Sequence, residues 1–235
     1  MKHSIFNILM AILLISTTTY SQQGVIGISY TKSYVDKDFH VSKVYYKGTN
    51  TQVPEETFNQ LVEENPNLFL ESVIDSEGRI TRYLYDPNLK DSEFQTITDS
   101  PQKGSFPNFK LTTISNDTII LSELKGKIVI LRFEMEATTF RFKKHEIQEL
   151  DDKINGLANK DSVAAIIVFD TSKSNVEKGF DLKDSNFKLV ANGRNFIEKY
   201  GIKYFPSTLV IDQNGSLIDI FRHVDEIDLE SYLKK

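Results

Sequence analysis

The chain has 235 residues, which is enough for one large domain or two small ones. Its net charge of −5 lacks the basic surplus that nucleic-acid-binding proteins use, so no nucleic-acid partner is expected. The sequence contains no cysteine, which excludes disulfides, thiol catalysis, thiolate metal sites and iron–sulfur clusters. Its histidines, His3, His40, His145 and His223, show no metal-ligand spacing, so no metal or other cofactor is expected.

The N-terminus, "MKHSIFNILMAILLISTTTYSQQG", has the layout of a secretory signal peptide. Lys2 and His3 precede an apolar run over residues 5–15, and small and polar residues follow up to Ser21. The run is shorter than the roughly 20 apolar residues of a membrane-spanning helix. We therefore expect residues 1–21 to be removed, leaving a periplasmic or secreted protein without a stable membrane span. An uncleaved membrane anchor is the alternative.

Residues 22–103 are expected to form a small α+β extension followed by a linker. The segment "HVSKVYYKG" predicts a strand, and "VPEETFNQLVEENP" predicts a short helix with Pro54 near its start. The segment "LFLESVIDSEGRITRYLYDP" predicts two strands joined by a tight turn over residues 75–78. The composition of residues 99–107 is typical of a linker.

Residues 104–235 are expected to form a second domain, which begins with two short strands around Asn116–Asp117. A one-turn helix at "LSELKG", capped by Ser122, comes next. The run "IVILRF", residues 128–133, is apolar on both faces, as a buried central strand should be. An amphipathic helix follows, and "SVAAIIVFD" predicts a second buried strand. Strand, helix and strand in this order predict a βαβ unit with parallel strands.

The C-terminal part of the sequence predicts antiparallel pairing. After a helix at "NGRNFIEKYGI", the segment "STLVIDQNGSLIDIF" contains Asn214–Gly215, a strong hairpin signal. A last helix is expected at "EIDLESYLKK". Parallel strands first and an antiparallel pair last predict an α/β, thioredoxin-like fold, with a central mixed sheet flanked by helices.

Four sequence blocks, in order, resemble the TlpA-type thioredoxin-like proteins, which are grouped with the AhpC/TSA redoxins. They are "GSFPNFKL", "LSELKGKIVILRF", "KHEIQEL" and "YGIKYFPSTLVIDQNGSLI". This resemblance covers a little over half of the chain. It implies a thiol–disulfide oxidoreductase fold, with a C-x-x-C motif after the central strand and a cis-proline at Pro206.

The residues at the expected redox site depart from this pattern. Counting from Phe133 places the family cysteines on Thr138 and Arg141, whereas counting back from the helix places them on Phe140 and Lys143. The disagreement indicates a loop that has gained length. Neither count finds sulfur, so no catalytic residue is assigned and thiol redox catalysis is not expected.

The resemblance implies that a peptide-binding surface is retained. In active relatives the residue before the cis-proline, here Phe205, offers its backbone to an extended peptide. We therefore expect a protein or peptide partner in the cell envelope. The candidate binding residues are Glu136, Thr138, Thr139, Phe140, Arg141, Phe205 and Pro206.

Several alternatives remain open at this point. The cis-proline needs no ligand if it only completes the fold. Arg141, Lys143 and Lys144 form an anion site if they belong to the first helical turn, but they lie in a solvated loop if the helix begins near His145. The protein is a non-thiol enzyme if Glu134, Glu136 or His145 acts as an acid or base, and a structural support if the second domain mainly carries the first.

Overall fold

The computed structural model describes residues 39–66, 68–89 and 102–234. The predicted signal segment, residues 1–21, and the start of the predicted extension lie outside these ranges. In the described ranges no helix is both long and apolar enough to cross a membrane.

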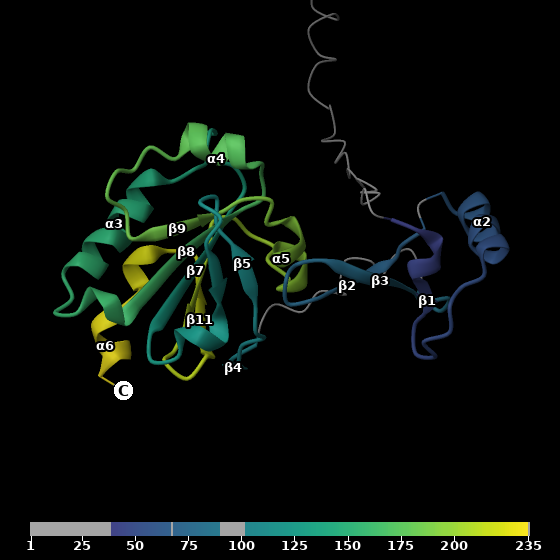
Figure 1. Ribbon diagram of the computed structural model, residues 1–235, viewed down its shortest axis with the longest axis horizontal. Helices are drawn as coiled ribbons and strands as arrows, with labels where there is room; N and C mark the ends of the chain where they lie inside the picture. Colours follow the sequence, from purple (N-terminus) through teal and green to yellow (C-terminus); the bar gives the residue numbers. More distant parts are fainter. Residues whose placement is uncertain (1–38, 67, 90–101, 235) are drawn as a thin grey trace, which may run out of the picture. The chain divides into compact units, whose positions relative to one another are not determined.

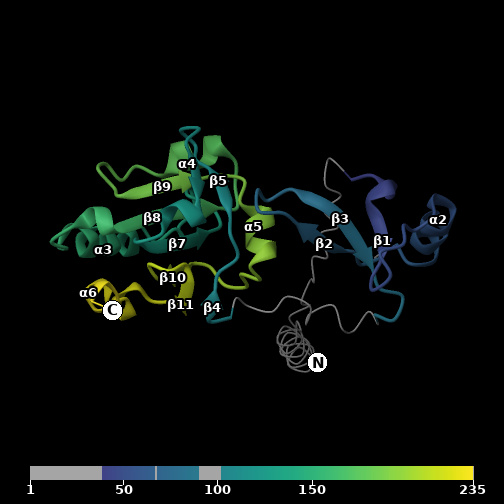
Figure 2. The ribbon, with the colours of Figure 1, turned by 60° about the horizontal axis from the view of Figure 1, so that its bottom comes forward.

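A six-stranded mixed sheet organises the C-terminal part of the chain, with the strand order β4-β11-β10-β7-β8-β9. Figure 2 shows this order across the sheet, with β7 and β10 near its centre. β7 pairs in parallel with β8 and antiparallel with β10. The strands are β4 (Gly104–Ser105), β7 (Ile128–Glu134), β8 (Val163–Phe169), β9 (Phe187–Val190), β10 (Ser207–Ile211) and β11 (Ser216–Phe221).

Helices cover both faces of this sheet, as expected from the βαβ pattern. Figure 1 shows α3 and α6 on one side of the sheet and α5 on the other. The helices are α3 (Lys144–Asn155), α4 (Lys173–Gly179), α5 (Arg194–Lys199) and α6 (Leu229–Leu233), with 3-10 turns η3 (Leu121–Leu124), η4 (Lys160–Ser162) and η5 (Val224–Glu226). Together with the sheet they confirm the predicted α/β, thioredoxin-like architecture.

The central strand β7 is buried along its whole length. Its side chains alternate between two hydrophobic clusters, because successive residues of a strand point to opposite faces. Val129, Leu131 and Phe133 join the cluster that contains the α5 residues. Ile128 and Ile130 join the cluster that contains the α3 residues. The same alternation directs Arg132 and Glu134 to the α3 face.

A separate three-stranded sheet precedes the linker, with the order β1-β3-β2. Val44, Val53 and Tyr83 form its buried core, against which Phe58 and Leu61 of the helix pack. The predicted strands and helix of this region are confirmed. The elements are η1 (Val41–Lys43), β1 (Val44–Tyr46), α2 (Glu55–Glu64), β2 (Glu71–Ile74) and β3 (Ile80–Tyr85).

The short hairpin before β7 also follows the prediction. β5 (Lys110–Thr112) pairs antiparallel with β6 (Thr118–Ile120), and Asn116 has a φ of 68° in the connecting turn. The predicted Ser122 cap is wrong. Ile120 occupies the N-cap position of η3 without a side-chain bond, and the Ser122 N–H instead donates to Asn108 Oδ1.

Sequence periodicity did not predict two elements. α4 has only one buried residue, Val176, so it has no apolar stripe to detect. β9 is only four residues long, and two of its four residues are buried. Residues 104–105, inside the stretch with linker composition, form β4 by pairing with β11.

Candidate functional site

The junction between β7 and α3 meets the start of β10 and the end of β11 at one edge of the sheet. Ser207 pairs with Phe133, and Thr208 pairs with Phe221. The residues just beyond these pairs therefore share this edge, and they include Glu134, Pro206 and Arg222. The Phe205–Pro206 peptide bond is cis, as the sequence resemblance implied.

The first part of the junction loop is fixed to α4. Asn175 Oδ1 accepts a hydrogen bond from the Ala137 N–H at 3.2 Å, and Asn175 Nδ2 donates to Thr138 Oγ1 at 2.9 Å. Gly179 approaches so closely that an added Cβ would lie 2.4 Å from the carbonyl carbon of Ala137. One side chain and one glycine of α4 therefore hold residues 137 and 138 in place.

The next residues of the loop face solvent. Phe140 is 93% exposed, and the Arg141 guanidinium lies 5.8 Å from the centroid of its ring. Glu136 and Thr138 are exposed, and Thr139 is half-buried. Phe142 is different: it is buried against the rings of Phe169 and Phe180. Phe140 is thus the side chain of this loop with most apolar surface available to a partner.

Both pairs of positions counted for the family cysteines fall before the helix. α3 begins at Lys144, with Lys143 as its N-cap. The late start of the helix, near His145, is confirmed. A residue at position 138 or 140 therefore lies in a turn and not in the first helical turn, where backbone N–H groups stabilise a thiolate in redox proteins.

A buried ionic cluster lies beneath the loop, on the α3 face of β7. Arg132 is fully buried, and it donates from Nε to Glu134 Oε1 at 2.8 Å and from Nη2 to Glu146 Oε2 at 2.6 Å. Arg132 Nη1 also donates to Thr208 Oγ1 at 3.1 Å. Lys143 completes the cluster by donating to Glu146 Oε1 at 2.7 Å. The cluster joins β7, β10 and the start of α3, which are the three elements that shape the junction.

The two carboxylates of this cluster have opposite pKa shifts. Loss of hydration raises the pKa of Glu134, because the attraction of Arg132 only partly compensates for burial. Burial also acts to raise the pKa of Glu146, but hydrogen bonds from Lys143 and Arg132 outweigh it and hold this pKa below its usual value. Glu146 is therefore the firmly ionised partner of Arg132.

The cations at the start of α3 are largely neutralised. Lys143 pairs with Glu146, and Lys144 pairs with Asp181 at 2.6 Å. A charge in the first helical turn opposes the helix dipole by about 0.3–1 kcal/mol when exposed, and these carboxylates offset it. The geometry therefore gives no support to an anion site that uses Lys143 and Lys144. Arg141 lies outside the helix, on the loop.

The residues of the acid–base alternative do not converge. Glu134 is buried and bound to Arg132, whereas Glu136 and His145 are exposed. Asp170, which follows β8, pairs with Arg194 at 2.7 Å. Ser172 is the residue that caps α4. No reactive pair is assembled from these side chains.

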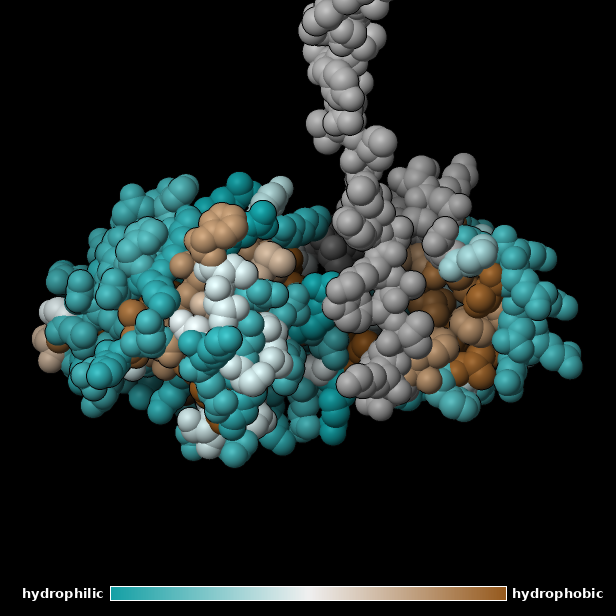
Figure 3. Space-filling model, turned by 90° about the horizontal axis from the view of Figure 1, so that it is seen from above, coloured by the Kyte–Doolittle hydropathy of each residue, from teal (hydrophilic) through white to brown (hydrophobic). Residues whose placement is uncertain are grey.

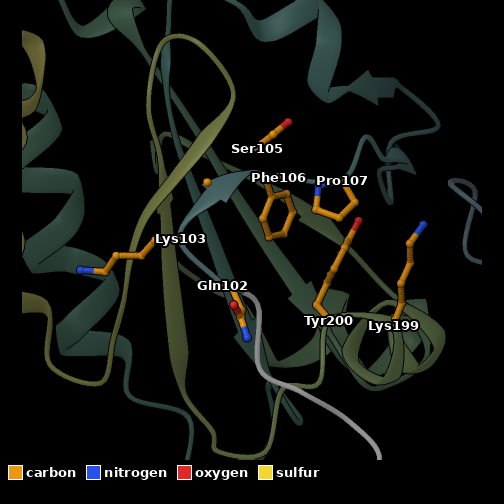
Figure 4. A pocket seen from close by; sticks show the side chains of 8 residues that line it. Gln102, Lys103, Ser105, Phe106, Pro107, Lys199 and Tyr200 are labelled. Carbon is orange, nitrogen blue, oxygen red and sulfur yellow. The ribbon is translucent and has the colours of Figure 1, made fainter.

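One cavity lies away from the junction, with a volume of about 280 Å³. Residues 102–107 and 199–200 line it, as Figure 4 shows. Lys103 points away from the Tyr200 ring and pairs with Asp219 at 2.7 Å. The Tyr200 hydroxyl is buried without a partner among the described residues, and burial raises its pKa, so the phenol stays protonated. We find no reactive group in this cavity.

A second depression, of about 210 Å³, adjoins the cis-proline loop. Its lining includes Lys203, Tyr204 and Arg222, all exposed, and the buried Ser207. The Arg222 guanidinium stacks 4.0 Å from the centroid of the Tyr204 ring, and Ser207 Oγ donates to the Tyr204 carbonyl at 2.7 Å. Among the described residues, the N–H and C=O of Phe205 have no hydrogen-bond partner. The loop therefore offers a stacked cation and free backbone groups.

Exposed apolar side chains gather at this edge of the sheet. Met135 is 43% exposed, Phe140 93% and Tyr204 57%. In Figure 1, α4, the helix that follows β8, lies at the top of the molecule. Figure 3 shows the molecule from that side. Brown hydrophobic areas in that view lie on the part that contains the six-stranded sheet and also on the part that contains the three-stranded sheet. Exposed large apolar residues of this kind are typical of surfaces that bind a partner.

The residues that sequence reasoning missed are of two kinds. Arg132 and Glu146 were hidden inside segments read as apolar strand and amphipathic helix, although a charged residue within "KIVILRF" was a usable signal. Tyr204 and Arg222 gave no signal, because their stacking joins the cis-proline loop to the residue that follows β11.

Comparison with known proteins gives one family match and several similar proteins. The AhpC/TSA family matches residues 103–220. Thioredoxin-like protein YneN of Bacillus subtilis (strain 168) is 28% identical over 116 residues, which are 48% of this chain and 67% of that protein. A solved thiol:disulfide interchange protein DsbE from Chlorobium tepidum is 21% identical and has a TM-score of 0.46, covering 57% of this chain and 97% of its own. A solved thiol peroxidase from Chromobacterium violaceum is 17% identical and has a TM-score of 0.46, covering 59% of this chain and 87% of its own.

The family match spans half of the chain, from just before β4 into β11. It contains both the β7–α3 junction and cis-Pro206. Within it, the positions at which the redox cysteines are expected hold threonine, phenylalanine, arginine or lysine. This chain belongs to the AhpC/TSA family, as a thioredoxin-like member without cysteine.

Proposed function

We propose that this chain is an exported, redox-inactive thioredoxin-like protein that binds an extended segment of another protein at the β7–α3 junction. The binding surface would comprise the loop residues Glu136, Thr138, Thr139, Phe140 and Arg141, with Phe205 and Pro206 opposite them. Export rests on the signal-like residues 1–21, and it would place the partner in the cell envelope.

One observation carries the proposal. The redox groups of the family are absent, yet the surface around cis-Pro206 keeps exposed apolar side chains and free backbone groups. Burial of the Phe140 side chain would contribute roughly 1.5–3 kcal/mol of hydrophobic free energy. Its exposure forgoes this contribution, which is understandable if the side chain is buried by a bound partner. The free backbone groups of Phe205 suit the addition of an extended peptide.

Thiol chemistry is not available to this chain by itself. Disulfide exchange requires a thiolate nucleophile, and peroxide reduction in this family uses one too. We therefore expect no reduction of insulin disulfides and no peroxide consumption by the purified protein. The non-thiol enzyme, with Glu136 or His145 as acid or base, remains less favoured because these side chains are exposed and separate.

An affinity capture from the native envelope fraction tests the proposal. The purified protein would serve as bait beside a Phe140→Ser variant and a control, Lys160→Glu, which changes an exposed residue before β8, at the opposite end of the strands. We expect a captured protein to bind the parent and the control but not Phe140→Ser. The same capture by all three baits would contradict the site, and a partner bound through the three-stranded sheet would favour a supporting role.

A further inference from the structure

The surface beside cis-Pro206 carries three cations that no described carboxylate neutralises. Arg141 lies on the junction loop, and Lys203 and Arg222 line the depression next to the cis-proline loop. Elsewhere around the junction, Lys143, Lys144 and Arg132 all have carboxylate partners.

One of these cations, Arg222, stacks on an exposed aromatic ring, and Arg141 lies near another. The guanidinium of Arg222 lies 4.0 Å from the Tyr204 ring centroid, and that of Arg141 lies 5.8 Å from the Phe140 ring centroid. A guanidinium held by its face on a ring keeps the N–H groups along its edge free. That edge matches a carboxylate with two parallel hydrogen bonds.

Carboxylates do occur near this surface, and they do not occupy these cations. Glu136 lies on the same loop as Arg141, and Asp225 and Glu226 follow Arg222 in the chain. In the described ranges none of the three comes within ion-pair distance of Arg141, Lys203 or Arg222. The cations are therefore available to a carboxylate supplied from outside.

We infer that the segment bound at the junction is acidic, with aspartate or glutamate residues flanking an apolar or aromatic side chain. This inference rests on the proposed function, and it specifies the chemistry of the partner. Arg222 and Lys203 receive carboxylates on one side of the cis-proline, and Arg141 receives one on the loop side. The apolar side chain of the segment packs against Phe140 and Tyr204, while its backbone pairs with Phe205.

Binding of short peptides tests the inference directly. The probe is a fluorescein-labelled peptide with a central phenylalanine flanked by aspartates, and matched probes carry serine or lysine in place of the aspartates. We expect fluorescence anisotropy to give an affinity for the aspartate probe at least about tenfold tighter than for the lysine probe. The difference should shrink at high salt, because exposed charges are screened.

Variants of the purified protein assign the charge preference to this surface. Arg222→Glu should weaken the aspartate probe by about tenfold, and Arg222→Lys should weaken it less, because lysine keeps the charge but loses the planar fork. Lys160→Glu makes the same charge change away from the surface and should leave binding unchanged. Equal melting temperatures would show that the variants are folded.

The outcomes separate this inference from the proposed function. Equal binding of the aspartate and lysine probes, still lost in Phe140→Ser, would overturn the acidic preference and leave peptide binding at the junction intact. An aspartate preference that survives Arg222→Glu would also overturn the inference. No binding of any probe, at any charge, would contradict the peptide-binding function itself.

Discussion

Arg132 Nη2 donates to Glu146 Oε2 at 2.6 Å, and this bond joins the central strand to the first turn of α3 inside the protein core. Arg132 fills the space directly beneath the loop where the family keeps its redox motif. The cluster holds the loop, the helix and β10 in a fixed arrangement without any covalent link. We therefore regard it as the structural base of the proposed binding surface.

Removal of Arg132 alone should be severely destabilising. Arg132→Met leaves Glu134 and Glu146 buried without their partner, which typically costs about 3–5 kcal/mol. Urea unfolding followed by circular dichroism would measure the change. The matched control is the combined variant Arg132→Met, Glu134→Leu and Glu146→Leu, which removes all the buried charges together and should recover much of the stability. An unchanged midpoint for Arg132→Met would refute the role given to the cluster.

The two carboxylates should act on stability in different pH ranges. The folded pKa of Glu146 is lowered, so its stabilising effect is present above the unfolded value, near 4.3, and is lost as the pH falls through the folded value. The folded pKa of Glu134 is raised, so its ionisation removes stability as the pH rises from about 4.3 to the folded value. The combined contribution of these two carboxylates to stability is therefore greatest near their unfolded pKa.

Two variants separate these contributions when the free energy of unfolding is measured against pH. Relative to the parent, Glu134→Gln should lack the decline above about pH 4.3. Lys143→Met removes a hydrogen bond to Glu146 and should move the acid loss of stability to higher pH. Parallel curves for parent and Glu134→Gln would show that Glu134 has an ordinary pKa in the folded protein.

Restored cysteines should not restore redox activity. In Thr138→Cys with Arg141→Cys, both thiols lie in the turn before α3, so the thiol at 138 should keep a pKa close to its usual value of about 8.5. The pH dependence of iodoacetamide alkylation would report this pKa, and insulin reduction would report activity. Rapid insulin reduction by the double variant would contradict this expectation. It would show that the chain lacks only the cysteine thiols and that the geometry of the junction loop still supports disulfide exchange.

Gly179→Ala should disturb the loop through packing. The added methyl group would meet the Ala137 backbone at 2.4 Å, and backbone cannot move aside as a side chain can. Overpacking of this kind typically costs about 1–3 kcal/mol. Thermal unfolding would measure it, with Gly156→Ala as a control because its nearest contact is 3.4 Å. Equal losses in the two variants would contradict the close approach of α4 to the loop.

Periodicity and turn chemistry were enough to predict most of the sheet. The apolar run of β7, the Asn214–Gly215 hairpin and the face of α3 each express one local rule, and the structure confirms them. α4 escaped detection because Val176 is its only buried residue. Short elements that are held in place by tertiary contacts have no distinctive pattern in the sequence.

The candidate site was predictable only in outline. The resemblance located the junction and the cis-proline, because both lie within or between sequence blocks that occur in the order of the family, and the cis bond is confirmed. The buried cluster was not predicted, because its members come from β7, β10 and α3 and meet only in the folded chain. The stacking of Arg222 on Tyr204 was not predicted for the same reason, because the two residues meet only in the folded chain.

Phe140 should matter for binding and not for stability. Because its side chain is 93% exposed, Phe140→Ser should change the free energy of unfolding by no more than about 0.5 kcal/mol. Phe142→Ser, two residues on, removes a buried ring and should cost about 3–5 kcal/mol. Urea titration of the two variants would check this contrast. A large loss in Phe140→Ser would mean that the ring is buried in solution.

The most direct test of the account is to map binding on the amide NMR spectrum of the isotope-labelled protein. The aspartate-flanked phenylalanine peptide would be titrated to saturation, with the lysine-flanked peptide as a control. We predict that the chemical-shift changes concentrate at residues 135–143, 203–207 and 222, and that they are absent from the three-stranded sheet. Changes confined to other surfaces, or an unchanged spectrum with excess peptide, would contradict the claim that the junction is a binding site.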